Sequence, residues 1–328
     1  MTLAALPKVE LHLHLEGAAP PAFIRGLAAR KGIDIAGIFR EDGSYRFRDF
    51  ADFLQVYEAA TSVLTTPEDY AALTRAVLQD RAEDGVIYAE TFLSPDFCGG
   101  SEVAAWREYL AAIREAATAA ERDFGITLRG IVTCIRHFGP DRARPVAVAA
   151  AETAGDWLTG FGIAGDERAG HLRDFAWSFD CAREAGLRLT AHAGEWDGPA
   201  SVRAALDDLG VERIGHGVRA IEDLALVDRL AEDRVMLEVC PGSNLALGLY
   251  PGWGAHPVAR LRDRGVRVSL STDDPPFFHT SLAREYDRLA DAFGWEADTF
   301  ATINRDALAA AFCDDATRDR LMPRLENP

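Results

Sequence analysis

VELHLHLEG, residues 9–17, alternates histidine and leucine in a way that is typical of a β-strand with two different faces. Side chains in a strand alternate between its faces, so the imidazoles of His12 and His14 are expected to point to the same side. Such a pair belongs either to a buried core or to a metal site, for which Zn²⁺ is a suitable ion. The polar residues elsewhere in the chain decide between these interpretations.

Short apolar runs alternate with helical patterns along the rest of the chain. Seven further strands are predicted at residues 86–93, 128–135, 159–165, 187–193, 213–216, 235–240 and 266–272. Helices are predicted between them at residues 103–124, 141–153, 174–185, 199–209, 224–231 and 257–263, with C-terminal helices starting at 281–290. This alternation indicates a parallel sheet, and eight units predict an α/β fold, a (β/α)8 TIM-type barrel. An open doubly wound sheet is the alternative, but no G-x-G-x-x-G follows the first strand.

An unusually long segment separates the first strand from the second. Helices are predicted there at residues 22–30, 47–63 and 67–83, whereas a connection from strand to helix is normally short. Long insertions of this kind tend to cover a site. We see neither a linker nor a repeat, and therefore predict one domain over residues 1–328, with this helical insertion after strand 1 and extra C-terminal helices.

The composition restricts the classes of function. The formal net charge of −17 argues against nucleic-acid binding, and no apolar run approaches the ~20 residues that a membrane span needs. The chain enters its first strand almost at once, so no signal peptide is expected. The five cysteines are scattered and form no C-x-x-C pair, which predicts a reduced, cytoplasmic protein.

Polar residues gather at the carboxyl ends of the predicted strands, which is the face on which barrel enzymes build their active sites. They are His12 and His14 on the first strand, His192 on the fifth, His216 on the sixth, and Asp273 and Asp274 on the eighth. Histidines of a buried core would have no reason to favour this rim. The clustering therefore favours metal ligation.

Three histidines and one aspartate form a suitable ligand set for Zn²⁺, with a further position open to water. A site with two metals on a similar scaffold often uses a carboxylated lysine as a bridge. Lys8 and Lys31 are the only lysines, and neither lies at the end of a middle strand. The sequence therefore predicts a single metal ion per chain.

Three further side chains suit proton transfer or substrate contact. Glu195 lies just beyond His192 and could protonate a ring nitrogen. His216, between two glycines, is either a fourth histidine ligand or a base that orients a metal-bound water. Asp273 and Asp274 cannot share one strand face, so one is expected to bind metal and the other to face substrate. The other four histidines, at 137, 171, 256 and 279, lack such context, and most of them are expected at the surface or behind the ligands.

Five motifs in the chain resemble those of the adenosine deaminase family in the amidohydrolase superfamily. They are PKVELHLHLEG at 7–17, AGDE at 164–167, HAGE at 192–195, IGHGV at 214–218 and STDDP at 271–275. The resemblance implies a (β/α)8 barrel that holds one Zn²⁺ and removes ammonia from C6 of a 6-aminopurine by hydrolysis. The implied partner is thus a small-molecule purine, while the oligomeric state is left open.

The resemblance also implies roles for individual residues. His12, His14, His192 and Asp273 would bind the metal. The catalytic residues would be Glu195, which protonates N1 of the purine, His216, which orients and deprotonates the zinc water, and Asp274, which contacts N7. His14, Glu16 and the backbone N–H of Gly165, which would contact N3, would complete the substrate site. Zinc deaminases of cytidine and of nucleic-acid bases carry a P-C-x-x-C motif, which is absent from this sequence.

Two motifs point to different substrates. Family members that act on adenosine have Asp where this chain has Glu16, at a position that meets the ribose 5′-hydroxyl, whereas adenine deaminases share HLEG. The AGDE motif resembles the adenosine enzymes instead. We expect adenosine or deoxyadenosine as substrate, with adenine or another N6-aminopurine as the alternative. A non-catalytic purine-binding relative and a hydrolase of amides or phosphoesters are less consistent with the residues present.

Overall fold

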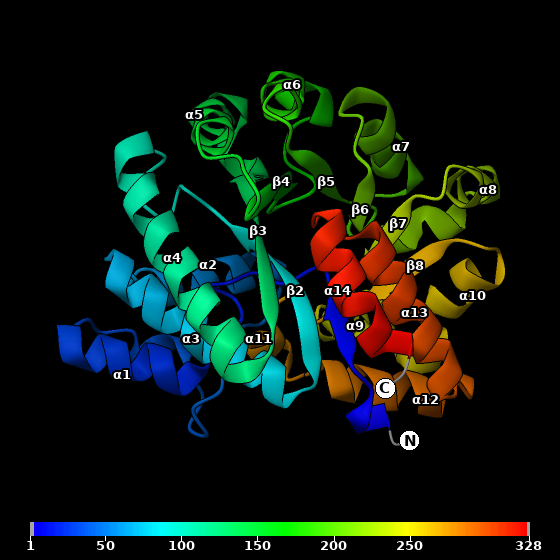
Figure 1. Ribbon diagram of the computed structural model, residues 1–328, viewed down its shortest axis with the longest axis horizontal. Helices are drawn as coiled ribbons and strands as arrows, with labels where there is room; N and C mark the ends of the chain where they lie inside the picture. Colours follow the sequence, from blue (N-terminus) through cyan, green and yellow to red (C-terminus); the bar gives the residue numbers. More distant parts are fainter. Residues whose placement is uncertain (1–2, 327–328) are drawn as a thin grey trace.

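The computed structural model, which describes residues 3–326, contains an eight-stranded parallel sheet whose strands follow one another in chain order (Figure 1). The strands are β1 (Lys8–Glu10), β2 (Val86–Leu93), β3 (Thr127–Ile135), β4 (Leu158–Ala164), β5 (Arg188–Ala193), β6 (Arg213–His216), β7 (Met236–Val239) and β8 (Arg267–Leu270). The predicted TIM-type barrel is confirmed. Residues 1 and 2, which entered the prediction that no signal peptide is present, lie outside the described part.

The barrel closes between β8 and the residues that follow β1. Strand β1 ends at Glu10, so the prediction that His12 and His14 lie within the strand is wrong. The backbone N–H groups of Leu11 and His12 both donate to Oγ of Ser271, at 3.2 Å each, instead of to a neighbouring strand. Beyond that point, the chain makes single bridges from Leu13 to Asp273 and from His14 to Phe92. The histidines thus lie just outside the regular ladder, at the rim.

Helices surround the sheet and extend the barrel at both ends of the chain (Figure 1). The insertion after β1 contains α1 (Pro21–Lys31), α2 (Phe50–Thr61) and α3 (Pro67–Glu83). The barrel helices are α4 (Val103–Phe124), α5 (Pro140–Ala151), α6 (Ala176–Glu184), α7 (Pro199–Asp208), α8 (Leu224–Glu232) and α10 (Val258–Asp263). The C-terminal helices are α12 (Leu282–Phe293), α13 (Ala297–Ala310) and α14 (Asp315–Glu326). These elements confirm the predicted insertion and the predicted C-terminal extension.

Two short helices were not predicted from the sequence. Helix α9 (Pro241–Ala246) follows β7, and α11 (Pro275–Phe278) follows β8. Each begins with proline, whose fixed backbone angle suits the first position of a helix. They are too short to show a helical repeat of apolar residues, so periodicity could not reveal them.

The insertion is held against the mouth of the barrel by aromatic packing. Phe53 of α2 lies 5.4 Å from Phe277 and 5.3 Å from Phe278 of α11, measured between ring centres. Tyr45, which precedes α2, stacks on Phe277 at 3.9 Å. A capping box formed by Thr66 and Asp69 fixes where α3, the next helix of the insertion, begins. Helix α2 therefore forms a wall over the carboxyl ends of the strands.

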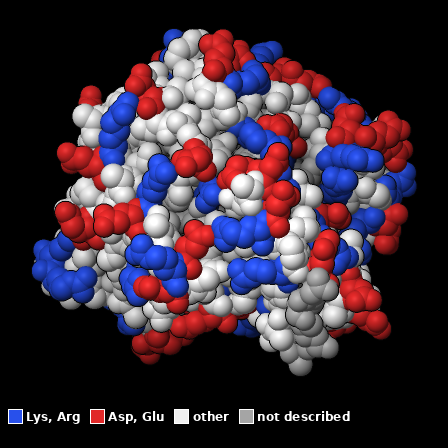
Figure 2. Space-filling model, in the orientation of Figure 1, with Lys and Arg blue, Asp and Glu red and all other residues white. Residues whose placement is uncertain are grey.

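The surface carries charges of both signs. Acidic and basic side chains are interspersed over the face shown in Figure 2. Such interspersed charge is typical of a solvated surface. Within residues 3–326, every helix is too short or too polar to cross a membrane.

The Ser271 hydroxyl provides a test of how the barrel closes. Ser271→Ala should lower the free energy of unfolding by about 1–3 kcal/mol, because two buried N–H groups lose their acceptor. Urea denaturation measures this loss. Ser62→Ala, at an exposed position at the end of α2, is the control and should change stability by less than about 0.5 kcal/mol. Equal midpoints for the two variants would contradict this account of closure.

Candidate active site

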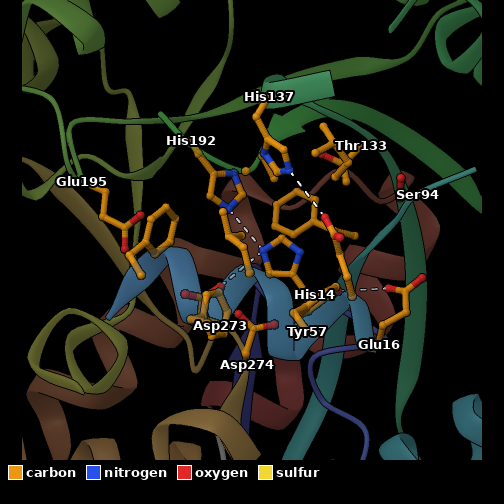
Figure 3. Close-up of a pocket in the computed structure, with 18 of the residues that line it drawn as sticks. His14, Glu16, Tyr57, Ser94, Thr133, His137, His192, Glu195, Asp273 and Asp274 are labelled. Atoms are coloured by element: carbon orange, nitrogen blue, oxygen red, sulfur yellow. Dashed lines mark hydrogen bonds and ion pairs between the residues drawn. The ribbon is translucent and has the colours of Figure 1, made fainter. Parts of the chain in front are cut away.

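Four side chains that the sequence assigned to metal binding meet at the carboxyl end of the barrel, and three of them, His14, His192 and Asp273, are labelled in Figure 3. Asp273 Oδ1 lies 3.5 Å from Nε2 of His12 and 3.3 Å from Nε2 of His14. Nε2 of His14 lies 3.2 Å from Nε2 of His192. One donor atom from each of the four residues lies within 4.8 Å of the others, so together they could hold a metal ion.

Two of these histidines are oriented by hydrogen-bond acceptors on the side of the ring that faces away from the cluster. Nδ1 of His12 lies 2.8 Å from Oε2 of Glu238, and Nδ1 of His192 lies 2.9 Å from the backbone oxygen of Ile163. An acceptor on Nδ1 fixes the ring and leaves Nε2 free to bind a metal, as is usual for metal-binding histidines. Nε2 of His12 is buried and has no hydrogen-bond partner, which is the arrangement expected of a ligand.

The charges in this cluster favour a cation. Burial lowers the pKa of His12, but Asp273 and Glu238 outweigh it and raise that pKa to about 9. Burial also opposes ionisation of Asp273, yet the nearby imidazoles of His12 and His14 hold its pKa well below the usual range. The two carboxylates therefore stabilise positive charge between them. A bound metal ion would supply that charge in place of a proton.

Glu238 connects the cluster to charged residues inside the barrel. Its Oε1 accepts hydrogen bonds from Thr190 Oγ1 at 2.9 Å and from Arg213 Nε at 2.7 Å. Arg213 also pairs with Glu90, and the side chains of all these charged residues are buried. A buried carboxylate needs such partners, because an unpaired charge is costly away from water. The sequence analysis did not identify Glu238.

Glu195 lies on a loop that is held by another carboxylate. Glu167, the last residue of AGDE, accepts hydrogen bonds from the backbone N–H groups of residues 194–197 and from Oγ of Ser201. Burial and the nearby charge of Asp273 raise the pKa of Glu195 well above its usual value. Glu195 is therefore suited to carry a proton near neutral pH and donate it.

The backbone at two strand ends has an unusual conformation. His216 has a φ of 59° and Asp273 a φ of 65°, in the left-handed region that non-glycine residues seldom occupy. The backbone of Asp273 is held by hydrogen bonds with His12 and His14, and its side chain by Ser243, whose Oγ donates to Oδ2 at 2.7 Å. Strained residues of this kind concentrate at functional sites, since the surrounding structure must compensate for them.

Asp274 faces the same pocket with an unpaired oxygen. Its Oδ1 is buried and lacks a hydrogen-bond partner in the protein, so it is available to a ligand. Gly17 makes room for it, because a Cβ at that position would lie 1.5 Å from this oxygen. Burial and the adjacent Asp273 raise the pKa of Asp274 well above its usual value.

Glu16 is held at one side of the pocket by side chains of the insertion. Tyr70 of α3 donates to its Oε1 at 3.0 Å, and Tyr57 of α2 donates to its Oε2 at 3.4 Å. Cys98 Sγ lies 3.8 Å from Oε1. Only 4% of the Glu16 surface is exposed, and burial raises its pKa to about 7. The sequence analysis did not identify the two tyrosines.

Gly165 lies at the pocket beside His137. Its φ is 98°, and a Cβ would lie only 2.6 Å from Nδ1 of His137, so no other residue fits there. Nδ1 of His137 accepts a hydrogen bond from the backbone N–H of Asp166 at 3.2 Å. His137 is thus the exception among the four histidines that the sequence left without a role, because this residue lines the pocket.

The structure brings the predicted site residues together. Those that line the pocket are His14, Glu16, Gly165, His192, Glu195, His216, Asp273 and Asp274. His12 is fully buried behind them. The sequence analysis missed the apolar wall of α2, which includes Phe50, Phe53 and Leu54, and the polar groups of Ser94 and Thr133. No spacing rule connects these positions to the motifs.

The geometry agrees with a comparison of the whole sequence. The model of the adenosine deaminase family matches residues 7–328. The chain belongs to the adenosine deaminase family. It is therefore an enzyme of the hydrolytic deaminase type, which acts on C–N bonds other than peptide bonds. This assignment agrees with the barrel and with the cluster at its rim.

Relatives within the adenosine deaminase family match over nearly the full length. An adenine deaminase of Agrobacterium fabrum is 51% identical over 321 residues, which are 98% of either chain. An adenine deaminase of Rhizobium leguminosarum is 49% identical, covering 98% of this chain and 99% of its own. Among solved structures, adenine deaminase from Arthrobacter aurescens has a TM-score of 0.90 at 32% identity, with 98% of each chain covered.

A second solved structure bears on the metal. An amidohydrolase from Burkholderia ambifaria with bound Zn has a TM-score of 0.87 at 28% identity and covers 99% of this chain and 90% of its own. The cluster of His12, His14, His192 and Asp273 in the present chain has the donor atoms that a zinc site requires.

Glu238 provides a test of the metal cluster. Glu238→Gln should lower the affinity for Zn²⁺ by about 10- to 100-fold, because the ring of His12 loses its charged acceptor. Competition with a chelator measures this affinity. Glu90→Gln is a matched control, since it also removes a charged partner of Arg213 but does not touch His12. An equal loss of affinity in both variants would contradict the role of Glu238.

Proposed function

We propose that this protein is a zinc-dependent adenine deaminase, which converts adenine and water to hypoxanthine and ammonia. This conclusion replaces adenosine, the first choice of the sequence analysis, with its alternative. The observation that carries it is the buried carboxylate of Glu16, whose oxygens accept hydrogen bonds from Tyr57 and Tyr70. The full-length relatives named adenine deaminase support the same choice.

Glu16 stands where the family resemblance puts the ribose end of a nucleoside. Its side chain is one methylene longer than the aspartate of enzymes that act on adenosine, and the two tyrosines hold it in place. A ribose would have to displace a carboxylate that is already buried and hydrogen-bonded, which costs free energy. Adenine has only hydrogen at N9 and needs no such space.

The AGDE motif, which favoured adenosine in the sequence analysis, carries no information about the ribose here. Glu167 holds the loop of residues 194–197, and Asp166 pairs with Arg168. Neither carboxylate lines the pocket. The two carboxylates of this motif are thus explained by loop structure, which leaves Glu16 as the carboxylate that bears on the choice between nucleoside and base.

In the proposed enzyme, His12, His14, His192 and Asp273 hold one Zn²⁺. When bound, this ion acts as a Lewis acid that makes water nucleophilic near neutral pH. The donor set of three imidazoles and one carboxylate suits zinc, and His12 offers a buried nitrogen without another partner.

The remaining pocket residues position the purine and move its protons. Glu195 gives a proton to N1, which withdraws electrons from C6 and makes attack by water easier. A general acid of this kind contributes about 10²–10⁴ in rate. His216 orients the attacking water. Asp274 contacts N7 through its free oxygen, and the backbone N–H of Gly165 contacts N3.

A direct assay tests the proposed function. The zinc-loaded protein should release ammonia from adenine with a kcat/KM at least about tenfold above that for adenosine or deoxyadenosine. Removal of the metal with a chelator should abolish turnover, and about one Zn²⁺ per chain should restore it. A preference for adenosine would contradict the proposal, as would activity that survives complete metal removal.

Substitution of Glu16 tests the basis of selectivity. Glu16→Asp should raise the adenosine-to-adenine ratio of kcat/KM by about tenfold or more, because one methylene in a pocket is worth about 10- to 200-fold in discrimination. Glu58→Asp is the matched control. It makes the same change on α2 at the rim of the same pocket and should leave the ratio unchanged. An unchanged ratio in Glu16→Asp would remove Glu16 from substrate selection.

A further inference from the structure

We propose that Asn244 and His256 are positioning residues, which orient the carboxyl group of Glu195 and fix the tautomer of His216. The proposal rests on the function proposed above, since it concerns how the acid and the histidine of that reaction are held. Both residues are buried, and the sequence analysis assigned no role to either. They lie on α9 and just before α10, on the side of β7 and β8.

The chain of contacts starts from a backbone group. The N–H of Val258 donates to Nδ1 of His256 at 3.3 Å, so this nitrogen acts as an acceptor and carries no proton. Burial lowers the pKa of His256 to about 3, which keeps the ring neutral. The single ring proton is then on Nε2, which donates to Oδ1 of Asn244 at 3.1 Å.

This hydrogen bond determines which way the amide of Asn244 faces. With Oδ1 turned to His256, the NH₂ group points to the active site. Nδ2 lies 3.3 Å from Oε1 of Glu195 and 3.3 Å from Nδ1 of His216. Asn244 is completely buried, so its two amide hydrogens have these two acceptors and no water. The opposite orientation would turn the NH₂ group of Asn244 towards the ring N–H of His256 and leave that ring proton unpaired.

The amide constrains both catalytic groups. Oε1 of Glu195 accepts from Asn244, so the proton that Glu195 donates to substrate is carried by Oε2. Nδ1 of His216 also accepts, so the neutral ring carries its proton on Nε2, which faces Asp273 Oδ2 at 3.9 Å. His216 therefore presents an N–H to the reaction centre, so in this tautomer it orients the water as a donor and does not take a proton from it, unlike the expectation from the sequence. The neighbouring Ser243 holds Asp273, so one short helix positions three groups of the site.

Four variants separate a positioning role from a contribution to packing. Asn244→Asp keeps the shape but loses the donor, and kcat for adenine should fall by about 10²-fold while KM changes less than about threefold. His256→Leu should lower kcat by about tenfold, and His256→Gln should recover most of it, because the glutamine amide can donate to Oδ1 in the same way. The control Asn304→Asp changes a fully buried asparagine at α13 and β1 and should lower stability with kcat kept within about twofold.

The tautomer provides a readout that packing alone would not change. In zinc-loaded protein with ¹⁵N-labelled histidine, NMR should show His216 protonated on Nε2, and Asn244→Asp should move the proton to Nδ1. The proposal is overturned if Asn244→Asp retains the kcat and the tautomer of the parent, or if His256→Gln is as slow as His256→Leu. If the parent protein deaminates no aminopurine, the proposed function fails. The positioning role is then decided by NMR alone, from the tautomer of His216 in the parent and in Asn244→Asp.

Discussion

The hydrogen bond between Glu238 and His12 connects the core of this barrel to its site. Glu238 comes from β7, its partner Arg213 from β6, and Glu90 below them from β2. Charges this deep are stable only when all are paired, so the three strands must keep their register for any of the pairs to survive. The same pairing holds the ring of His12 with Nε2 facing Asp273. Fold and metal cluster therefore depend on one set of contacts.

Above the core, the groups proposed to react are held by side chains from the segments that follow the strands. Glu167 gathers the N–H groups around Glu195, Ser243 holds the side chain of Asp273, and Asn244 lies between Glu195 and His216. These contacts come from segments after β4, β5 and β7. Rigid support of this kind keeps reacting groups close to productive geometry, which is where much of the catalytic power of enzymes arises.

In the proposed enzyme, selectivity, in contrast, comes from the insertion. Helices α2 and α3 supply the tyrosines that hold Glu16, and α2 supplies the apolar wall of the pocket (Figure 3). The chemistry thus resides on the barrel rim, whereas the substrate is chosen by a segment added to the barrel. In the motif HLHLEG, the histidines therefore indicate the reaction, whereas Glu16 indicates which purine is the substrate.

The sequence alone determined the barrel and the metal cluster, because both follow from local patterns. Strand β2 and helix α4 begin and end where periodicity predicts, and the residues assigned to metal binding lie at strand ends that any parallel barrel brings together. Only the tertiary structure decided the early end of β1, the contacts of Glu16 with Tyr57 and Tyr70, and the pair formed by Asn244 and His256. Tyr70 is 54 residues from Glu16, and α9 is too short for a periodic signal. Side-chain contacts between distant segments follow no period, so they become visible only once the chain has folded.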